Sequence, residues 1–303
     1  MMIGPSKKYE NLTTSLPYLS CLNPIEPQLR IGFIGDLMRI GNTDMQLGDD
    51  VRAFFEDVDY IVGNLEGVLV DPDHPTRPFS TGERLSESML GLLKQFNDPS
   101  RIILSCANNH AGDYGQHHFD HTCKMLQDEG FLCIGSSDQP AIELENGINL
   151  VACTQWSNQP ASFLSFLSEA DASYNPDAHM NVLVLHWGYQ MQLYPSPHQI
   201  ITARDLLKKW DMLIGHHSHC PQPITSYSAG HYQKLIAYSL GNFTYRRDRN
   251  NYRYGCIVKA ELGPDLYGQW STGTCQWAYS RVNFLSRGRN KRAEIRLSDL
   301  PRW

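Results

Sequence analysis

Side chains that could bind a metal ion follow several apolar runs of this sequence, at the point where each run ends. Five runs have such residues at or just after their ends: Asp36, Glu66, Asn109 with His110, His186, and His217 with His219. In α/β folds, ligands bind beyond the carboxyl ends of the strands, where the loops meet. If the five runs are strands, these side chains are therefore expected to share one site.

The expected site mixes carboxylate oxygens with imidazole nitrogens. On an extended backbone, residues two apart point to the same side, so His217 and His219 could reach one metal centre. Such a ligand set suits Mn²⁺, Fe²⁺ or Zn²⁺, and it argues against a sulfur site or a pure Ca²⁺ cage. The number of candidate ligands exceeds what one tetrahedral ion needs. It therefore suggests two ions that share a bridging carboxylate.

Each of these residues alone has an ordinary structural explanation. Asp36 could cap a helix, and Glu66 could be a solvated carboxylate at the rim of the sheet. Asn108 and Asn109 could form turns, and His186 could be a hydrogen-bonded histidine of the core. The coincidence of five strand ends favours the shared site over five separate explanations.

The elements that must position these residues are apolar runs that alternate with helix-like stretches. The predicted strands cover residues 29–34, 60–63, 102–105, 148–153, 181–186, 212–215 and 234–238. The predicted helices cover residues 45–55, 84–96, 116–129, 161–170 and 197–210. Most of the strand runs are continuously apolar, as in strands that are covered on both faces. The alternation predicts an α/β domain with a substantial sheet.

The chain divides into an irregular lead-in, residues 1–29, and a single domain, residues 30–303. The lead-in contains four prolines and little periodicity. Between residues 252 and 298, aromatic residues and valines recur at short spacing with glycines between them. This pattern predicts strands and turns that complete a second sheet, so residues 246–303 are interpreted as a mostly β completion of the domain.

Composition and charge exclude several classes of protein. Of the 303 residues, 41% are hydrophobic and 19% are charged, as in ordinary globular proteins, and the net charge of −6 argues against a nucleic-acid partner. No apolar run approaches the roughly 20 residues that span a bilayer, and the N-terminus lacks the apolar region of a secretory signal. The eight cysteines form no CxxC pair, which predicts free thiols in a reducing compartment. We therefore expect a cytoplasmic protein without a transmembrane segment.

Six motifs follow one another between about residues 30 and 245. They are Gly35-Asp36, Asn64-Leu65-Glu66, Ala107-Asn108-Asn109-His110 with Asp113-Tyr114-Gly115, His186-Trp187-Gly188, Gly215-His216-His217-Ser218-His219, and Tyr238-Ser239-Leu240-Gly241-Asn242-Phe243. In combination they resemble the CapA-type family (PGA_cap) of bacterial capsule and poly-γ-glutamate synthesis proteins. That family is similar to the calcineurin-like metallophosphoesterases.

The resemblance implies a four-layer α-β-β-α sandwich, like that of the metallophosphoesterases, with divalent metal ions at the strand ends. It implies two ions and the following ligands: Asp36 on one or both ions, Glu66 as the bridge, Asn109, His186 and His217 on the second ion, and His219 on the first. His110 would protonate the leaving group, so the implied catalytic residues are His110, Asp36 and Glu66. Weaker candidates for substrate contact are Asn108, Asp113 and Arg77, the last as a clamp for an anionic substrate.

Two departures from the phosphoesterase pattern affect the predicted function. Met38 stands where those enzymes have a histidine, and a thioether is a poor ligand for hard divalent ions. Glu66 stands where they have an aspartate. The first hypothesis is a metal-dependent hydrolase of phosphoesters, acting on a small molecule or a polymer and linked to capsule synthesis. The alternatives are a non-catalytic metal- or polymer-binding component of capsule assembly, and a metal-dependent amide hydrolase for a γ-glutamyl or peptidoglycan-like substrate.

Overall fold

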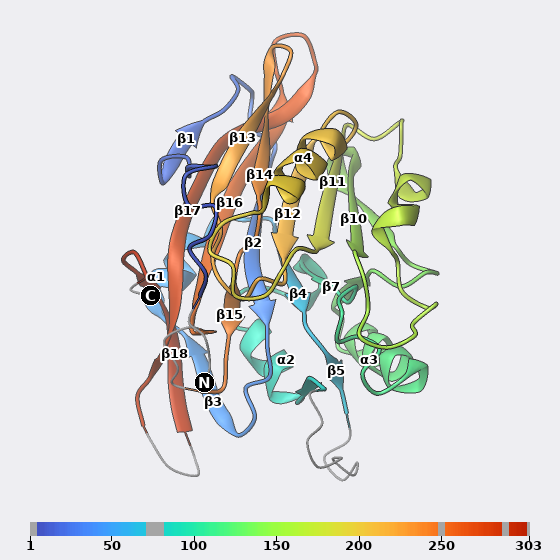
Figure 1. Cartoon of the computed structure of the whole chain (residues 1–303), viewed down its shortest axis with the longest axis vertical. Helices are drawn as coiled ribbons and strands as arrows, with labels where there is room; N and C mark the ends of the chain where they lie inside the picture. Colours follow the sequence, from blue (N-terminus) through green and yellow to red (C-terminus); the bar gives the residue numbers. More distant parts are fainter. Residues whose placement is uncertain (1–4, 71–81, 248–251, 287–290, 302–303) are drawn as a thin grey trace.

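A computed structural model describes residues 5–70, 82–247, 252–286 and 291–301, and these residues form two large sheets (Figure 1). The ten-stranded sheet contains β1 (Leu19–Cys21), β2 (Leu29–Leu37), β3 (Thr43–Leu47), β4 (Tyr60–Leu65), β7 (Ile102–Ser105), β8 (Leu132–Ile134), β15 (Asn242–Thr244), β16 (Tyr254–Pro264), β17 (Trp270–Phe284) and β18 (Lys291–Ser298). The six-stranded sheet contains β9 (Ala141–Leu144), β10 (Ile148–Thr154), β11 (Met180–His186), β12 (Met212–His216), β13 (Ile224–Ala229) and β14 (Tyr232–Ala237). The mixed α/β class predicted from the sequence is confirmed.

The remaining elements are short. The helices are α1 (Asp49–Phe54), α2 (Ser88–Leu93), α3 (Gln116–Asp128) and α4 (Pro197–Leu206). Three 3₁₀ segments cover Pro99–Arg101, Glu145–Gly147 and Leu167–Ser173, and β5 (Val68–Leu69) pairs with β6 (Arg84–Leu85). No helix in the described parts of the chain is long and apolar enough to cross a membrane.

Parallel strands at the centre of each sheet bring their carboxyl ends together. In the larger sheet, β2, β4, β7 and β8 run parallel in this order. In the smaller sheet, β10, β11, β12 and β14 are parallel neighbours. In Figure 1 the arrowheads of β2, β11 and β12 point toward the same end of the molecule. The loops that follow these strands therefore meet, as the position of the candidate ligands requires.

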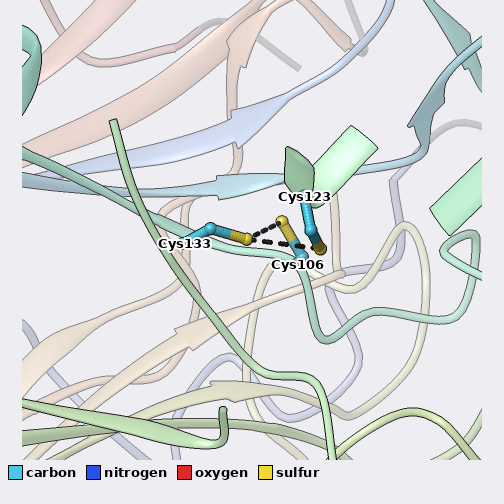
Figure 2. Close-up of side chains that lie close together, drawn as sticks. All are labelled: Cys106, Cys123 and Cys133. Carbon is cyan, nitrogen blue, oxygen red and sulfur yellow. Dashed lines mark hydrogen bonds between the residues drawn. The ribbon is translucent and has the colours of Figure 1, made fainter. Parts of the chain in front are cut away.

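The strand β7, the strand β8 and the helix α3 meet at one edge of the larger sheet. Cys106 directly follows β7, Cys133 lies in β8 and Cys123 lies on α3. The sulfur atoms of these three residues lie close together (Figure 2). The eight cysteines of the chain are free thiols, as the sequence predicts.

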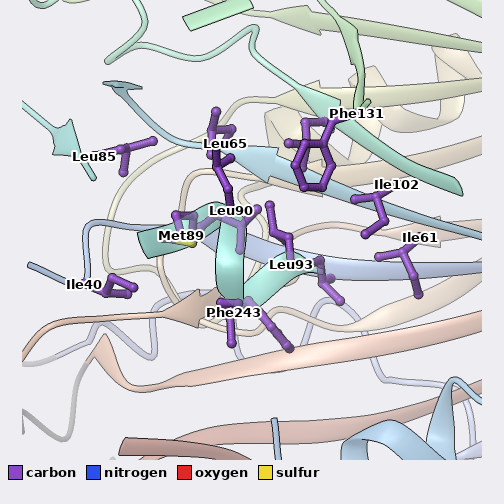
Figure 3. Close-up of a cluster of buried hydrophobic side chains, with 14 of the residues drawn as sticks. Ile40, Ile61, Leu65, Leu85, Met89, Leu90, Leu93, Ile102, Phe131 and Phe243 are labelled. Carbon is purple, nitrogen blue, oxygen red and sulfur yellow. The ribbon is translucent and has the colours of Figure 1, made fainter. Parts of the chain in front are cut away.

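Three hydrophobic clusters hold the elements together. One lies between the two sheets and includes Phe33 of β2 and Val184 of β11. A second cluster lies between the larger sheet and α1, α2 and α3, where Leu93 packs among the residues shown in Figure 3. A third cluster packs α4 against the smaller sheet through Ala203. The two sheets thus face one another, and each buries its other face under helices.

The C-terminal strands occupy a different place from the predicted one. The sequence predicts that they complete a second sheet, but β16 pairs antiparallel with β2 and so extends the sheet that contains the first long strand. The lead-in also contributes to this sheet, because β1 pairs with β17. These pairings join residues far apart in the chain, which a local pattern does not reveal.

One predicted helix is wrong, and another is only partly right. Residues 43–47 form the strand β3, in which buried and exposed side chains alternate, and only Asp49–Phe54 is helical. Residues 161–170 contain no α-helix, and the only helical part is the 3₁₀ segment Leu167–Ser173. Isolated β-bridges hold this stretch instead, from Leu164 to Ser136 and from Phe166 to Thr154. Tertiary pairing therefore overrides the local helical pattern in both stretches.

Candidate metal centre

Asp36 lies at the carboxyl end of β2 and is fully buried. Asn64 Nδ2 donates a hydrogen bond of 2.8 Å to Asp36 Oδ1, and the backbone N–H of His217 donates one of 3.2 Å to Oδ2. The residue before it, Gly35, has no room for a side chain, because a Cβ there would lie 2.2 Å from the carbonyl oxygen of Gly241. The close approach of these two segments fixes the carboxylate where both sheets meet.

Glu66 follows β4 and is also fully buried. Neither carboxylate oxygen has a hydrogen-bond partner among the described residues. Its Oε1 lies 3.6 Å from His219 Nε2 and 3.8 Å from His186 Nε2, too far for hydrogen bonds. A buried carboxylate without a partner is costly, and a bound cation would remove that cost. Glu66 therefore fits the role of a metal ligand.

His186 ends β11 and lies between two other polar groups. Its Nε2 is 2.7 Å from Asn109 Oδ1 and 3.0 Å from His217 Nδ1. One proton on Nε2 cannot satisfy both contacts, so lone pairs of nitrogen and oxygen converge on the same small space. This arrangement, like the unpartnered carboxylate, fits a cation held between the two histidines, Asn109 and Glu66.

The backbone that carries His217 and His219 differs from the extended segment predicted from the sequence. The strand β12 ends at His216, and the φ angles of His217 and His219 are +92° and +55°. Left-handed backbone at a non-glycine residue is strained and is held only by the surrounding structure. The two imidazoles nevertheless remain neighbours, with ring centroids 5.8 Å apart.

The candidate ligands fall into two groups that share one residue. Within each group, ligand atoms lie within 4.8 Å of one another: Asp36, Glu66 and His219 in the first, and Glu66, His186 and His217 in the second. Glu66 belongs to both. Such a division fits two ions with a shared carboxylate, although the identity and number of ions stay predictions.

Burial and neighbouring charges shift the titration of these ligands. Burial lowers the pKa of His217 to about 3, and burial with the charge of His217 holds the pKa of His186 well below its ordinary value. Both imidazoles are therefore neutral and can offer lone pairs. Burial also raises the pKa of Asp36, but contacts with His216 and His219 outweigh it and hold that pKa well below its ordinary value.

Glu66 shows the opposite shift. Burial, followed by the negative charge of Asp36, raises the pKa of Glu66 well above its ordinary value. Two buried carboxylates close together resist ionising at once, and a cation between them would relieve this repulsion.

The loop after β7 carries His110 close enough to His217 for their charges to interact, and Asp113 holds the His110 ring. His110 Nδ1 lies 2.6 Å from Asp113 Oδ2, which also accepts a 2.9 Å hydrogen bond from the backbone of Glu83. Asn108 donates to the carbonyl oxygen of Leu65 and accepts from the backbone of His110. These contacts give Asp113 and Asn108 positioning roles, and their contact with substrate stays a prediction. Arg77 lies outside the described residues.

Three polar residues around the site had no predicted role. Asn64 bridges two ligands, since its Nδ2 also lies 3.3 Å from His186 Nδ1. Asn242 Oδ1 lies 3.0 Å from His219 Nδ1, and the strand β15 places Asn242 beside Asp36. His216 is buried with Nδ1 3.1 Å from Asp36 Oδ1. All three residues lie in the sequence motifs described above. Their partners lie on or just after other strands, so the sequence alone does not indicate them.

A hollow of about 370 Å³ opens beside His217. Trp156 forms one side, with its ring edge-on to the imidazole of His217 at 4.6 Å between centroids. Tyr189 and Gln190 also line the hollow, and Gln190 Nε2 lies 3.4 Å from His219 Nε2. The second ligand group is therefore accessible from a cavity large enough for a small molecule or the end of a polymer.

Met38, two residues beyond Asp36, is buried and offers no nitrogen or oxygen from its side chain. Its backbone carbonyl accepts a 2.6 Å hydrogen bond from Thr244. The first ligand group, Asp36, Glu66 and His219, thus lacks the histidine that the phosphoesterase pattern has at this position.

Comparison with known proteins gives a consistent assignment. The family described as bacterial capsule synthesis protein PGA_cap matches residues 31–148 and 156–246. The PGA biosynthesis protein CapA of Bacillus subtilis (strain 168) is 25% identical over 278 residues, which cover 80% of this chain and 70% of that protein. The capsule biosynthesis protein CapA of Bacillus anthracis is 22% identical over 267 residues, 78% of this chain and 64% of that protein. The chain thus spans about two thirds of the length of these relatives.

Two solved structures are similar over 82% of this chain at 14% identity. A hypothetical protein from Thermus thermophilus aligns over 98% of its length with a TM-score of 0.49. A putative 5'-nucleotidase from Staphylococcus aureus, solved in complex with alpha-ketoglutarate, aligns over 54% of its length with a TM-score of 0.48.

Proposed function

The chain belongs to the bacterial capsule synthesis protein family PGA_cap, and on this premise we propose that it is a metal-dependent hydrolase of phosphoesters. The observation that carries the proposal is Glu66, a buried carboxylate without a partner that is shared by two groups of potential ligands. The two facing sheets with helices on their outer faces support a sandwich of the metallophosphoesterase type. The link to capsule or poly-γ-glutamate synthesis rests on the names of the relatives.

In this proposal the candidate ligands hold two ions. The first ion would be held by Asp36, Glu66 and His219, and the second by Glu66, Asn109, His186 and His217. Bound divalent ions supply two effects here, since they neutralise negative charge that develops on phosphoryl oxygens and lower the pKa of water. A substrate would enter through the hollow beside His217.

His110 would deliver the proton to the leaving group. Its contacts with Asp113 and Asn158 both use Nδ1, so Nε2 is the nitrogen that would transfer the proton. Asp113 would hold the ring in one orientation and one tautomer, as carboxylates beside catalytic histidines do. This role requires the substrate to bind beside His110. It is tested below by comparing the cleavage of substrates whose leaving groups differ in basicity.

A non-catalytic role in capsule assembly is the second candidate, and Met38 is the observation that favours it. The group of Asp36, Glu66 and His219 would have to hold an ion without the missing imidazole. If that ion is absent or weakly bound, the remaining ion would bind an anionic polymer without the charge neutralisation that hydrolysis needs.

The test combines metal analysis with turnover. Protein purified without chelator is analysed for Mn, Fe and Zn, and is then assayed with p-nitrophenyl phosphate, bis-p-nitrophenyl phosphate and a γ-glutamyl anilide after Mn²⁺ or Zn²⁺ is supplied. We expect the carboxylate and histidine ligands to hold about two ions per chain and the protein to cleave phosphoesters, and we expect Glu66→Ala to lose both these ions and the activity. His231→Ala is the matched control, because His231 is exposed on the turn between β13 and β14.

The outcomes separate the candidates. Cleavage of the anilide alone would replace the phosphoesterase by an amide hydrolase. Bound metal without turnover on any substrate would favour the assembly role. A protein that binds no metal after reconstitution would end the proposal. His110→Asn should slow substrates with basic leaving groups more than p-nitrophenyl esters, because only the former need a proton.

A further inference from the structure

Three cysteines from separate elements bring their sulfur atoms together in a group that shares no residue with the carboxylate and histidine ligands. Cys106 directly follows β7, Cys133 lies in β8, and Cys123 lies on α3. The Sγ atoms of Cys106 and Cys133 are 3.1 Å apart, and those of Cys133 and Cys123 are 3.5 Å apart. All three sulfurs lie within 4.8 Å of one another and point toward a common centre (Figure 2).

The cluster lies between the core and the surface. Cys106 is buried, whereas Cys123 and Cys133 are half-buried. Cys123 also lines a hollow of about 380 Å³ together with Asp120, Lys124 and others of α3 and the loop after β8. An ion therefore has a route from solvent to Cys123.

We propose that Cys106, Cys123 and Cys133 form a thiolate site for a soft, closed-shell metal ion such as Zn²⁺ or Cu⁺. Three cysteines with an open fourth position are the ligand set that such ions accept, and hard ions are poorly held by sulfur. With a metal–sulfur distance of about 2.3 Å, the sulfurs of a trigonal or tetrahedral site lie roughly 3.8–4.0 Å apart. The thiols would therefore move apart by less than an ångström to admit the ion.

Binding requires each cysteine to offer a thiolate. Contacts with Cys106 and Cys133 lower the pKa of Cys123 to about 4, so this sulfur is ready to bind at neutral pH. Contacts with the other two sulfurs and burial raise the pKa of Cys106 well above its ordinary value. Its proton, like that of Cys133, would pass to solvent as the sulfur donates its lone pair to the ion.

The backbone at the end of β8 packs closely against the backbone that follows β7. Gly135, just after β8, has a φ of +106°, and a Cβ there would lie 2.7 Å from the backbone nitrogen of Ala107. The backbone N–H of Cys106 also donates a 2.8 Å hydrogen bond to Ile134. An ion in the cluster would tie α3 and β8 to the segment that continues from Cys106 to Asn109.

The experiment titrates the reduced, chelator-treated full chain with Cd²⁺, whose thiolate complexes absorb in the ultraviolet whereas carboxylate and imidazole ligands give no such absorption. We expect this absorption to reach the amplitude of one Cd²⁺ thiolate centre per chain, however much Cd²⁺ the carboxylate and histidine ligands take up. Cys123→Ala and Cys133→Ala should each lower its amplitude and weaken binding at least tenfold. Cys153→Ala is the matched control, since Cys153 is a buried thiol of β10 outside the cluster, and it should leave the titration unchanged.

A second measurement uses only the wild-type chain and so does not depend on whether a variant folds. Cd²⁺ at the saturating level of the titration should protect the half-buried Cys123 and Cys133 of the wild-type chain from alkylation, as located by mass spectrometry of peptides, while the exposed Cys21 is alkylated as before. The proposal is overturned if the reduced chain develops no thiolate absorption and no protection. It is equally overturned if Cys123→Ala and Cys133→Ala titrate like the wild type.

Discussion

At the scale of single residues, substitution of Glu66 is the strongest test of the proposed metal centre. Burial raises the pKa of this carboxyl and so favours its neutral form when no metal is bound. A carboxyl whose pKa is raised by folding contributes stability below its unfolded pKa and loses it as pH rises through the folded pKa. In chelator at pH 8, Glu66→Gln should therefore unfold at a higher temperature than the wild type. Each unit of pKa shift corresponds to about 1.4 kcal/mol.

The same substitution has the opposite effect once metal is present, because glutamine offers no charge to bridge two ions. Thermal unfolding in chelator at pH 5 and pH 8, and again with Mn²⁺ at pH 8, measures both effects. The advantage of Glu66→Gln should shrink at pH 5, where more of the wild-type carboxyl is protonated. Glu87→Gln, an exposed control, should unfold like the wild type throughout. A wild type more stable than Glu66→Gln in chelator at pH 8 would contradict the assignment.

Asn64 should control metal affinity without being a ligand. Its amide holds Asp36 and contacts His186, and loss of such a supporting partner typically costs 10- to 100-fold in metal affinity. Asn64→Ala should show this loss by titration with Zn²⁺. The control is Asn149→Ala. Asn149 is also buried and makes two side-chain hydrogen bonds, but it lies at the amino end of β10, whereas the candidate ligands lie at the carboxyl ends of their strands. Equal losses of affinity in both variants would refute a specific role for Asn64.

At the scale of elements, the approach of β2 to the segment before β15 depends on Gly35. Its missing Cβ is what allows the N–H of Asp36 to donate a 2.7 Å hydrogen bond to Gly241. Gly35→Ala should destabilise the fold by about 1–3 kcal/mol and also weaken metal binding, since the backbone must shift. Gly91→Ala in α2 meets no atom within 4 Å and should be neutral or stabilising by about 0.5–1 kcal/mol. Chemical denaturation of both variants decides the matter, and a Gly35→Ala protein as stable as Gly91→Ala would contradict the packing argument.

The elements also show what a sequence pattern can and cannot predict. The mainly apolar run at 102–105 is a strand with the predicted bounds and with every side chain buried, because such a run is stable where both faces of the strand are covered. Residues 45–55 have apolar positions that suit a helix, yet Met45 and Leu47 face the core from β3, which pairs with β18 at the far end of the chain. The cysteine cluster has no local pattern at all, since Cys106 and Cys133 are 27 positions apart. The sequence predicted which residues follow the strands, and the structure brings these residues together, but their supporting asparagines depend on register across strands.

At the scale of the whole molecule, the candidate ligands come from both sheets. Asp36 and Glu66 lie at or just after the ends of strands of the larger sheet, whereas His186, His217 and His219 lie at or just after the ends of strands of the smaller one. Each ligand group therefore contains residues from both sides of the hydrophobic layer between the sheets. An ion in either group would join the sheets directly, in addition to the apolar contacts between them.

Metal removal should consequently lower the stability of the entire fold. A ligand that binds only the native state stabilises it by about 2.7 kcal/mol at one hundred times its dissociation constant, which is a shift of several degrees in Tm for a chain of this size. Calorimetry with and without chelator measures the shift, which His217→Ala should reduce and His231→Ala should preserve. Hydrogen exchange should show the added protection in β2, β4, β11 and β12 together, because these strands lead directly into the ligands from both sheets. Protection confined to one sheet would mean that the ion does not bridge them.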